Sequence, residues 1–208
     1  MTNGIAIKDL VVLVADKNME FAIKGLLKRH SALGVKAVDF DLYAHPEKDP
    51  GCLLRAEAFL RPFNLSHKFA LVIFDREGCG RESDTREQLE TRVEERLKGS
   101  GWNGRSACIV IDPELEMWVW GDSPHVPVAL GWKNQETALR DWLRARELWA
   151  ADDPKPHRPK EAVESVLRFV RKPRSSAMYG ELAENVSTDR CTDGAFGKLK
   201  GVLQAWFS

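Results

Sequence analysis

Three apolar stretches of the sequence end in an aspartate. They are VVLVAD, LVIFD and CIVID, which end at Asp16, Asp75 and Asp112. Further acids follow within a few residues of these positions: Glu20, Glu77, Glu114 and Glu116. An uninterrupted apolar run is typical of a strand buried on both faces of a parallel sheet, and the carboxyl ends of parallel strands share one edge. The sequence therefore predicts a cluster of carboxylates at that edge.

Carboxylates gathered in one place repel one another, so a bound cation, a partner arginine or raised pKa values must compensate. Mg²⁺ or Mn²⁺ suits such a site, since Mg²⁺ needs only one or two direct carboxylates and completes its shell with water. A carboxylate-bound Mg²⁺ most often serves phosphoryl transfer or phosphodiester cleavage. We expect Asp75, Glu77 and Glu116 to bind the metal. Asp16 or Glu20 is expected to transfer a proton or to complete the metal site.

Each acid also has a purely structural explanation. Asp112 precedes Pro113, so it is expected to cap the helix that follows. Glu20 can simply favour the positive N-terminus of a helix. Asp16 can be a solvated turn residue, and Glu116 can point inward from a helix. The sequence leaves these alternatives open.

The apolar patterns predict an α/β fold with a mainly parallel sheet of about four strands flanked by helices. Buried strands are expected at 10–15, 69–74 and 107–111, and a half-exposed edge strand at 35–43. A helix capped by Asn18 should follow the first strand. Further helices are expected at 55–60, at 84–98 with a capping box of Asp84 and Glu87, at 134–150, at 161–171 and from Phe196 to Trp206.

The strand patterns stop after Gly121. We therefore expect an α/β domain over residues 1–122 and a helical C-terminal extension over 123–208, packed on the same core. A charged, proline-rich linker, ADDPKPHRPK, is expected at 151–160.

The segment 158–174 is rich in basic residues and is a candidate phosphate-backbone contact, although a solvated helix face explains it too. Its basic residues are Arg158, Lys160, Arg168, Arg171, Lys172 and Arg174, against Glu161 and Glu164. The indoles of Trp118, Trp120 and Trp132 lie close in sequence to the third acidic turn. They are expected in the core, with base stacking as the alternative.

Composition narrows the function further. Lysine plus arginine equals aspartate plus glutamate, 31 each, so no overall charge draws the chain to nucleic acid or to an anionic membrane. The start does not resemble a signal peptide, and no apolar run reaches the roughly 20 residues that span a bilayer. Four scattered cysteines indicate thiols in a reducing compartment. We expect a cytoplasmic protein with no membrane contact. P-loop and GxGxxG signatures are missing, which weighs against the common nucleotide-binding folds.

These motifs resemble Toprim-like proteins, whose fold occurs in primases, topoisomerases and OLD-type nucleases. More closely, the chain looks like small Toprim-like proteins of bacterial antiphage defence and restriction clusters, which show EG-x-TE after the first strand, then D-x-D, then PELE-x-W. The corresponding stretches here are ADKNMEFAI (15–23), FDREG (74–78) and DPELEMW (112–118), and CTDGAFGKLKGVLQAW (191–206) is similar to their C-terminal helix. The first motif departs from the EG-x-TE pattern, because Ala15 stands at the glutamate position and Asp16 at the glycine position. The D-x-D is here D-x-E, Asp75 and Glu77.

The resemblance implies the roles that these positions have in Toprim enzymes. There the first glutamate acts as a general acid or base, and the D-x-D holds Mg²⁺. We therefore expect a Mg²⁺-dependent nuclease of an antiphage defence system, which contacts other defence proteins and reaches nucleic acid through 158–174. The alternative is a non-catalytic Toprim-like subunit that binds a partner protein as a sensor or scaffold. Ala15 favours the subunit, whereas Asp75, Glu77 and Glu116 favour the enzyme. A phosphate-transfer or nucleotide-binding protein is a third reading.

Overall fold

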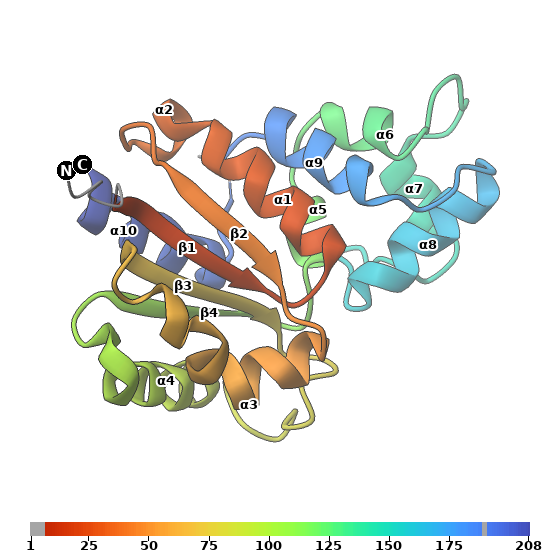
Figure 1. Ribbon diagram of the computed structural model, residues 1–208. Coiled ribbons are helices and arrows are strands. Elements are labelled where there is room, and N and C mark those ends of the chain that lie inside the picture. Colours follow the sequence, from red (N-terminus) through yellow and green to blue (C-terminus); the bar gives the residue numbers. More distant parts are fainter. Residues whose placement is uncertain (1–6, 189–190) are drawn as a thin grey trace.

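The computed structural model describes residues 7–188 and 191–208, and a four-stranded sheet lies at its centre (Figure 1). Its strands are β1 (Lys8–Val14), β2 (Phe40–Ala44), β3 (His67–Asp75) and β4 (Ser106–Ile111). They lie in the order β2-β1-β3-β4, and every neighbouring pair is parallel. This confirms the predicted α/β class with a parallel sheet.

Burial along the strands explains their sequence patterns. The central strands β1 and β3 and the C-terminal part of β4 are buried on both faces, which is why their residues are apolar without interruption. The edge strand β2 is only partly buried throughout, in keeping with its alternation of apolar and acidic residues.

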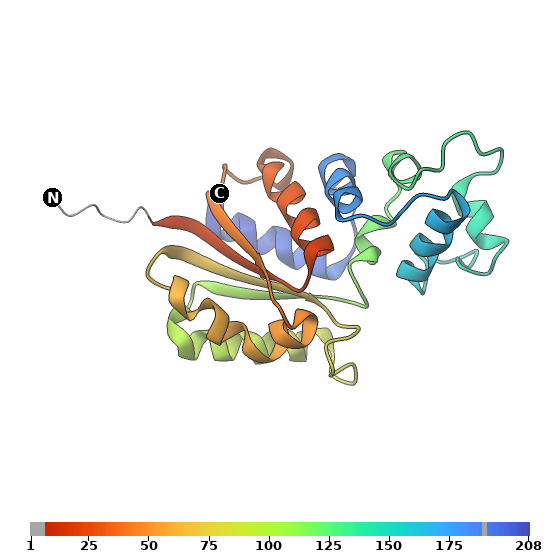
Figure 2. The ribbon, with the colours of Figure 1, turned by 45° about the vertical axis from the view of Figure 1, so that its right-hand side comes forward.

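Helices cover both faces of the sheet (Figures 1 and 2). One face carries α3 (Lys48–Leu60) and α4 (Arg86–Leu97), and the other carries α1 (Lys17–Lys28) and α10 (Gly194–Phe207). The helix α9 (Ser176–Asn185) packs along α1. A Cβ at Gly25 would lie 2.9 Å from Cβ of Ala183, so glycine permits this close approach. The remaining helices are α2 (His30–Leu33), η1 (Arg61–Phe63), η2 (Lys98–Trp102), α5 (Glu116–Val119), α6 (His125–Ala129), α7 (Leu139–Arg144) and α8 (Pro159–Phe169).

The segment after Gly121 is helical and adds no strand in the part of the chain that the structure describes. The helices α6, α7 and α8 stand beyond the carboxyl ends of the strands (Figure 1). The chain then returns, so that α9 packs on α1 and α10 on β4. Among the described residues, no helix is long and apolar enough to cross a membrane.

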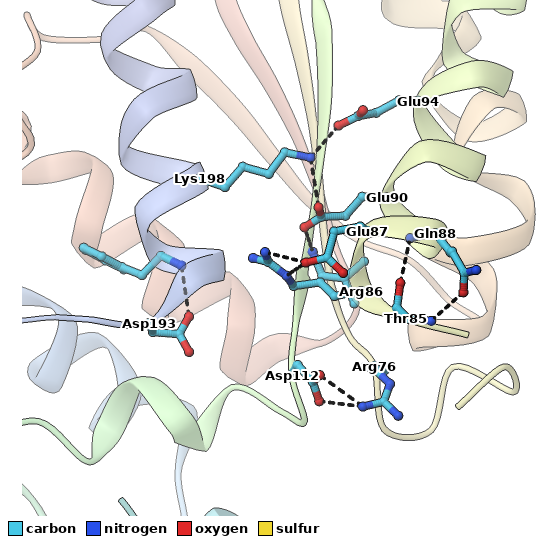
Figure 3. A network of polar contacts seen from close by, with 12 residues as sticks. Arg76, Thr85, Arg86, Glu87, Gln88, Glu90, Glu94, Asp112, Asp193 and Lys198 are labelled. Carbon is cyan, nitrogen blue, oxygen red and sulfur yellow. Dashed lines mark hydrogen bonds and ion pairs between the residues drawn. The ribbon is translucent and has the colours of Figure 1, made fainter. Parts of the chain in front are cut away.

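Three helix starts differ from the sequence prediction. The cap of α1 is Asp16, whose Oδ1 accepts from the backbone N–H of Met19, rather than Asn18. The capping box of α4 consists of Thr85 and Gln88 (Figure 3), rather than Asp84 and Glu87. Asp84 instead pairs with Arg92 at 3.2 Å. The helix predicted at 55–60 begins already at Lys48. Neighbouring polar residues compete for the same cap, and backbone geometry selects one of them.

Two further helices differ from the sequence prediction. The helix predicted at 134–150 shrinks to α7, since Asn134 and Glu147 adopt positive φ angles of 60° and 57°, which a helix does not allow. The helix α9 was not predicted, because its apolar positions follow no strong helical period and α1 determines their packing.

Candidate functional site

The strand register brings the predicted acids to one edge of the sheet. Val14 of β1 pairs with Ile73 of β3, and Asp75 pairs with Ile111 of β4. Asp16 and Asp75 therefore both lie at the carboxyl ends of adjacent strands, as predicted.

Among the acids of this edge, Asp75 has the most strongly raised pKa. The residue as a whole is partly exposed, but its Oδ1 atom is buried, and no group in the described residues donates to it. Burial raises the pKa of Asp75 well above its ordinary value, and neighbouring negative charges raise it further. Those charges belong to Asp49, Glu116, Asp16 and Glu114. We refer to these five residues as the carboxylate cluster.

Asp49 belongs to this cluster although sequence reasoning missed it. It lies in the first turn of α3, and its Oδ1 accepts the backbone N–H of Asp75 at 2.9 Å. Burial raises the pKa of Asp49, only partly offset by that hydrogen bond, and the charge of Asp16 adds to the rise. The available signal was the Asp49-Pro50 pair, which is typical of a helix start. It was overlooked because the helix was expected to begin only at residue 55.

Asp16 combines two functions in the structure. Its Oδ1 caps α1 by accepting the N–H of Met19 at 2.9 Å, so it stabilises the helix. Its charge also acts on Asp49 and Asp75. Glu20, one turn later, pairs with Lys17 at 2.7 Å.

Glu116 is held by cationic and hydroxyl donors. Its side chain is 3% exposed, and its Oε1 accepts from Nη2 of Arg174 at 2.5 Å and from the hydroxyl of Tyr179. Arg174 also pairs with Glu164 at 3.1 Å. Burial and the adjacent Glu116 raise the pKa of Tyr179, so this hydroxyl keeps its proton and donates.

Glu114 is buried beside Lys160. Its Oε1 accepts the backbone N–H of Lys160 at 3.0 Å, and Nζ of the same lysine lies 3.6 Å from Oε2. Burial raises the pKa of Glu114, as does the charge of Glu116. Burial alone would lower the pKa of Lys160, but the carboxylates of Glu114 and Glu116 outweigh it and raise that pKa. Lys160 and Arg174, both from the basic segment 158–174, thus insert into the carboxylate cluster.

Asp112 and Glu77 lie outside the carboxylate cluster. Both oxygens of Asp112 accept from Nη1 of Arg76, at 2.9 and 3.0 Å (Figure 3). The expectation that Asp112 caps the next helix is wrong, because α5 begins only at Glu116. Glu77 is exposed on the loop after β3.

A divalent cation such as Mg²⁺ needs several oxygen ligands around it, of which the protein must supply at least one or two carboxylates. Within residues 7–188 and 191–208, no three histidine, cysteine or acidic side chains are placed to hold a metal ion together. Asp49 nevertheless lies close enough to Asp75 for its charge to raise the pKa of Asp75, and Oδ1 of Asp75 has no partner among the described residues. This fits Mg²⁺, which takes one or two carboxylates and otherwise water. Glu116 fits less well, because its Oε1 already accepts two hydrogen bonds.

Comparison with solved structures finds two similar folds. The C-terminal region of the Burkholderia pseudomallei OLD protein matches with a TM-score of 0.53 and 12% identity, over 95% of this chain and 98% of that one. The C-terminal region of the Xanthomonas campestris pv. campestris OLD protein matches with a TM-score of 0.52 and 14% identity, over 94% of both chains. No protein-family model matches the chain, and no curated protein matches it significantly. At these identities the similarity establishes an OLD-type, Toprim-like fold.

Proposed function

Because the chain has the Toprim-like fold of OLD C-terminal regions, we propose that it is a Mg²⁺-dependent enzyme that cleaves phosphodiester bonds in bacterial antiphage defence. The observation that carries the proposal is Asp75. A carboxylate oxygen buried without a donor is costly in a folded protein, and here the negative charge of Asp49 acts on the same carboxylate. An unfavourable burial that raises a pKa in this way is typical of catalytic and binding sites.

The charge balance of the site supports a cation. In the part of the chain that the structure describes, two basic side chains pair with the five acids of the carboxylate cluster, Lys160 with Glu114 and Arg174 with Glu116. The excess negative charge is relieved either by protons, which is what the raised pKa values of Asp49 and Asp75 express, or by a divalent cation.

Each residue then has a definite role. Asp49 and Asp75 would hold Mg²⁺ or Mn²⁺, and Glu77 would reach the same site from its exposed loop. The cation, when bound, would neutralise charge that develops on the phosphoryl oxygens. Asp16, next to Asp75 in the cluster, would move the proton of the attacking water, with Glu20 one helical turn away. Glu116 would orient Arg174 and Tyr179 at the border of the site.

A second candidate is a non-catalytic subunit that binds a partner protein as a sensor or scaffold. Two observations favour it. Ala15, at the position of the Toprim glutamate, is 2% exposed and offers no group for proton transfer. The ion pair between Glu116 and Arg174 also removes one predicted metal ligand. In this function Lys160 and Arg174 alone would balance the cluster.

Isothermal titration with Mg²⁺ and Mn²⁺ separates the two candidates. The enzyme requires that the wild type binds a divalent cation and that Asp75→Asn and Asp49→Asn each weaken the binding at least tenfold. Asp112→Asn is the matched control, because its carboxylate lies at the same edge but is engaged by Arg76. Cleavage of DNA and RNA should require the cation and vanish in Asp75→Ala. A wild type that binds no divalent cation and cleaves neither polymer would leave the partner-binding subunit.

A further inference from the structure

Three aromatic rings gather in the helical segment beyond the sheet, and one of them is exposed. The ring centroids of Trp132, Trp142 and Phe169 lie 4.9 to 5.4 Å apart. Both indoles are buried, at 8% exposure, whereas Phe169 is 47% exposed. The guanidinium of the exposed residue Arg146 lies 3.8 Å above the ring of Trp142 and 5.8 Å from that of Phe169. Buried indoles thus hold an exposed phenyl ring beside an exposed guanidinium.

Two exposed arginines lie close to Phe169 in the chain. Arg168 and Arg171 flank Phe169 in the chain, both are exposed, and the structure gives neither side chain a hydrogen bond or ion pair within the described residues. The acids of α8 are engaged elsewhere, since Glu161 pairs with Arg158 at 2.8 Å and Glu164 with Arg174 at 3.1 Å. We call Arg146, Arg168, Phe169 and Arg171 the aromatic–arginine patch.

The helix α8 connects this patch to the carboxylate cluster. Lys160, in its first turn, contacts Glu114, and Phe169 is its last residue. At 1.5 Å per residue the two are separated by about 14 Å along the helix. A stacked strand carries one phosphate per about 3.4 Å, so roughly four nucleotides cover this distance. A strand lying on the patch can therefore reach the site.

We propose that the aromatic–arginine patch binds single-stranded nucleic acid. One base stacks on Phe169 beside the guanidinium of Arg146, and Arg168 and Arg171 contact the flanking phosphates. Bases of a single strand expose their faces to aromatic rings and guanidinium planes, whereas bases of a duplex are already stacked. The positive charge of the patch complements the phosphates. The inference rests on the proposed function in naming how substrate reaches the site, but binding itself needs neither metal nor cleavage.

Fluorescence anisotropy with a labelled short oligothymidine in EDTA tests the proposal, because no cleavage occurs without a divalent cation. Phe169→Ala should weaken binding roughly five- to a hundredfold, the range of one lost base–aromatic stack. Phe169→Tyr should retain affinity, whereas Phe169→Leu should behave like alanine although it keeps an apolar side chain. Arg168→Gln and Arg171→Gln should each lower the slope of log affinity against log salt by about 0.7.

Two matched controls lie at the opposite edge of the sheet, before β3. Leu65→Ala removes another exposed apolar side chain, and Arg61→Gln another exposed arginine. Both should bind like the wild type, and thermal melts would check that each variant is folded. The same sequence as a duplex should bind more weakly, while oligouridine distinguishes RNA from DNA as the source of the strand.

Three results would overturn the proposal: no binding of any oligonucleotide, equal affinity of wild type and Phe169→Ala, or full affinity of Phe169→Leu. The proposed enzymatic function fails separately. If Asp75→Asn and wild type bind the strand equally through Phe169 but nothing is cleaved with Mg²⁺, the patch stands and the enzyme does not. If nucleic acid is cleaved but binding is the same in Phe169→Ala and in the wild type, the proposed enzyme is supported and the proposed binding patch is not.

Discussion

The backbone N–H of Asp75 donates to Oδ1 of Asp49 over 2.9 Å, which ties the end of β3 to the first turn of α3. This bond fixes the carboxylate of Asp49 at the backbone of Asp75, close enough for its negative charge to raise the pKa of the Asp75 side chain. The backbone of β3 cannot move away, since it is buried between β1 and β4. Protonation or a cation must relieve the repulsion, and each alternative has measurable consequences.

The first prediction concerns the dependence of stability on pH. The raised pKa values of Asp49 and Asp75 mean that the folded protein keeps protons that the unfolded chain loses near its ordinary value of 3.8. The folded state then binds more protons, so the free energy of unfolding falls as pH rises from about 4 through the raised pKa values. Asp75→Asn should be more stable than wild type at pH 7 and show a flatter dependence in metal-free urea titrations.

Asp112→Asn is the control for this prediction, since it loses an ion pair with Arg76 instead of a repulsion. It should not gain stability at neutral pH. A lower stability of Asp75→Asn at pH 7 would contradict the repulsion and make Asp75 a structural partner.

The second prediction concerns the effect of metal on folding. A cation that binds only the folded state raises the melting temperature with its concentration. Mg²⁺ should stabilise the wild type more at pH 8 than at pH 5, because the cation binds deprotonated carboxylates. The effect should disappear in Asp75→Asn and in Asp49→Asn. If the melting temperature of the wild type at pH 8 does not change with Mg²⁺, the partner-binding subunit is favoured.

The third prediction concerns the departure from the Toprim motif. Ala15 is 2% exposed, so Ala15→Glu places a carboxylate in the core beside the carboxylate cluster. It should destabilise the metal-free protein by several kcal/mol. If the site binds Mg²⁺, the cation should restore part of this loss and bind more tightly than in the wild type. Ala15→Gln is the control of similar size without charge, and an equal response of both variants to Mg²⁺ would speak against a metal site there.

The fourth prediction concerns the buried pair of Glu116 and Tyr179. Tyr179→Phe removes one donor to a buried carboxylate and should cost about 1.5–3 kcal/mol of unfolding free energy. Glu116→Ala leaves Arg174, 30% exposed, without its buried partner and should cost about as much. We expect cleavage to vanish in Glu116→Ala. If Glu116 acts only by positioning, Tyr179→Phe should also lower the rate while divalent affinity in titrations stays unchanged.

The fifth prediction separates the two functions of Asp16. Asparagine caps helices as well as aspartate, so Asp16→Asn should preserve the stability of α1, whereas Asp16→Ala should cost about 1 kcal/mol. Proton transfer by Asp16 would be lost in both variants. Full cleavage activity in Asp16→Asn would therefore exclude this residue as the acid or base.

The shared edge of Asp16 and Asp75 was predictable from the sequence because it follows from strand direction. Parallel strands buried on both faces are continuous apolar runs, and their carboxyl ends share an edge. Asp49 escaped prediction, because the Asp49-Pro50 pair can indicate a helix start but not that the first turn of this helix packs against Asp75. The role of Asp112 was predicted wrongly, since a cap depends on where the next helix starts.

By itself, the sequence determined the parallel sheet, its buried strands and the edge at which acids accumulate, because burial imposes a pattern on neighbouring residues. Only the tertiary structure decided which charges meet. Glu116 is bound by Arg174 and Tyr179, which lie 58 and 63 positions away in the chain. Asp75 meets Asp49 across 26 positions. Such partners are set by how helices pack over the sheet, and side-chain pairing between distant segments leaves no periodic trace in the sequence.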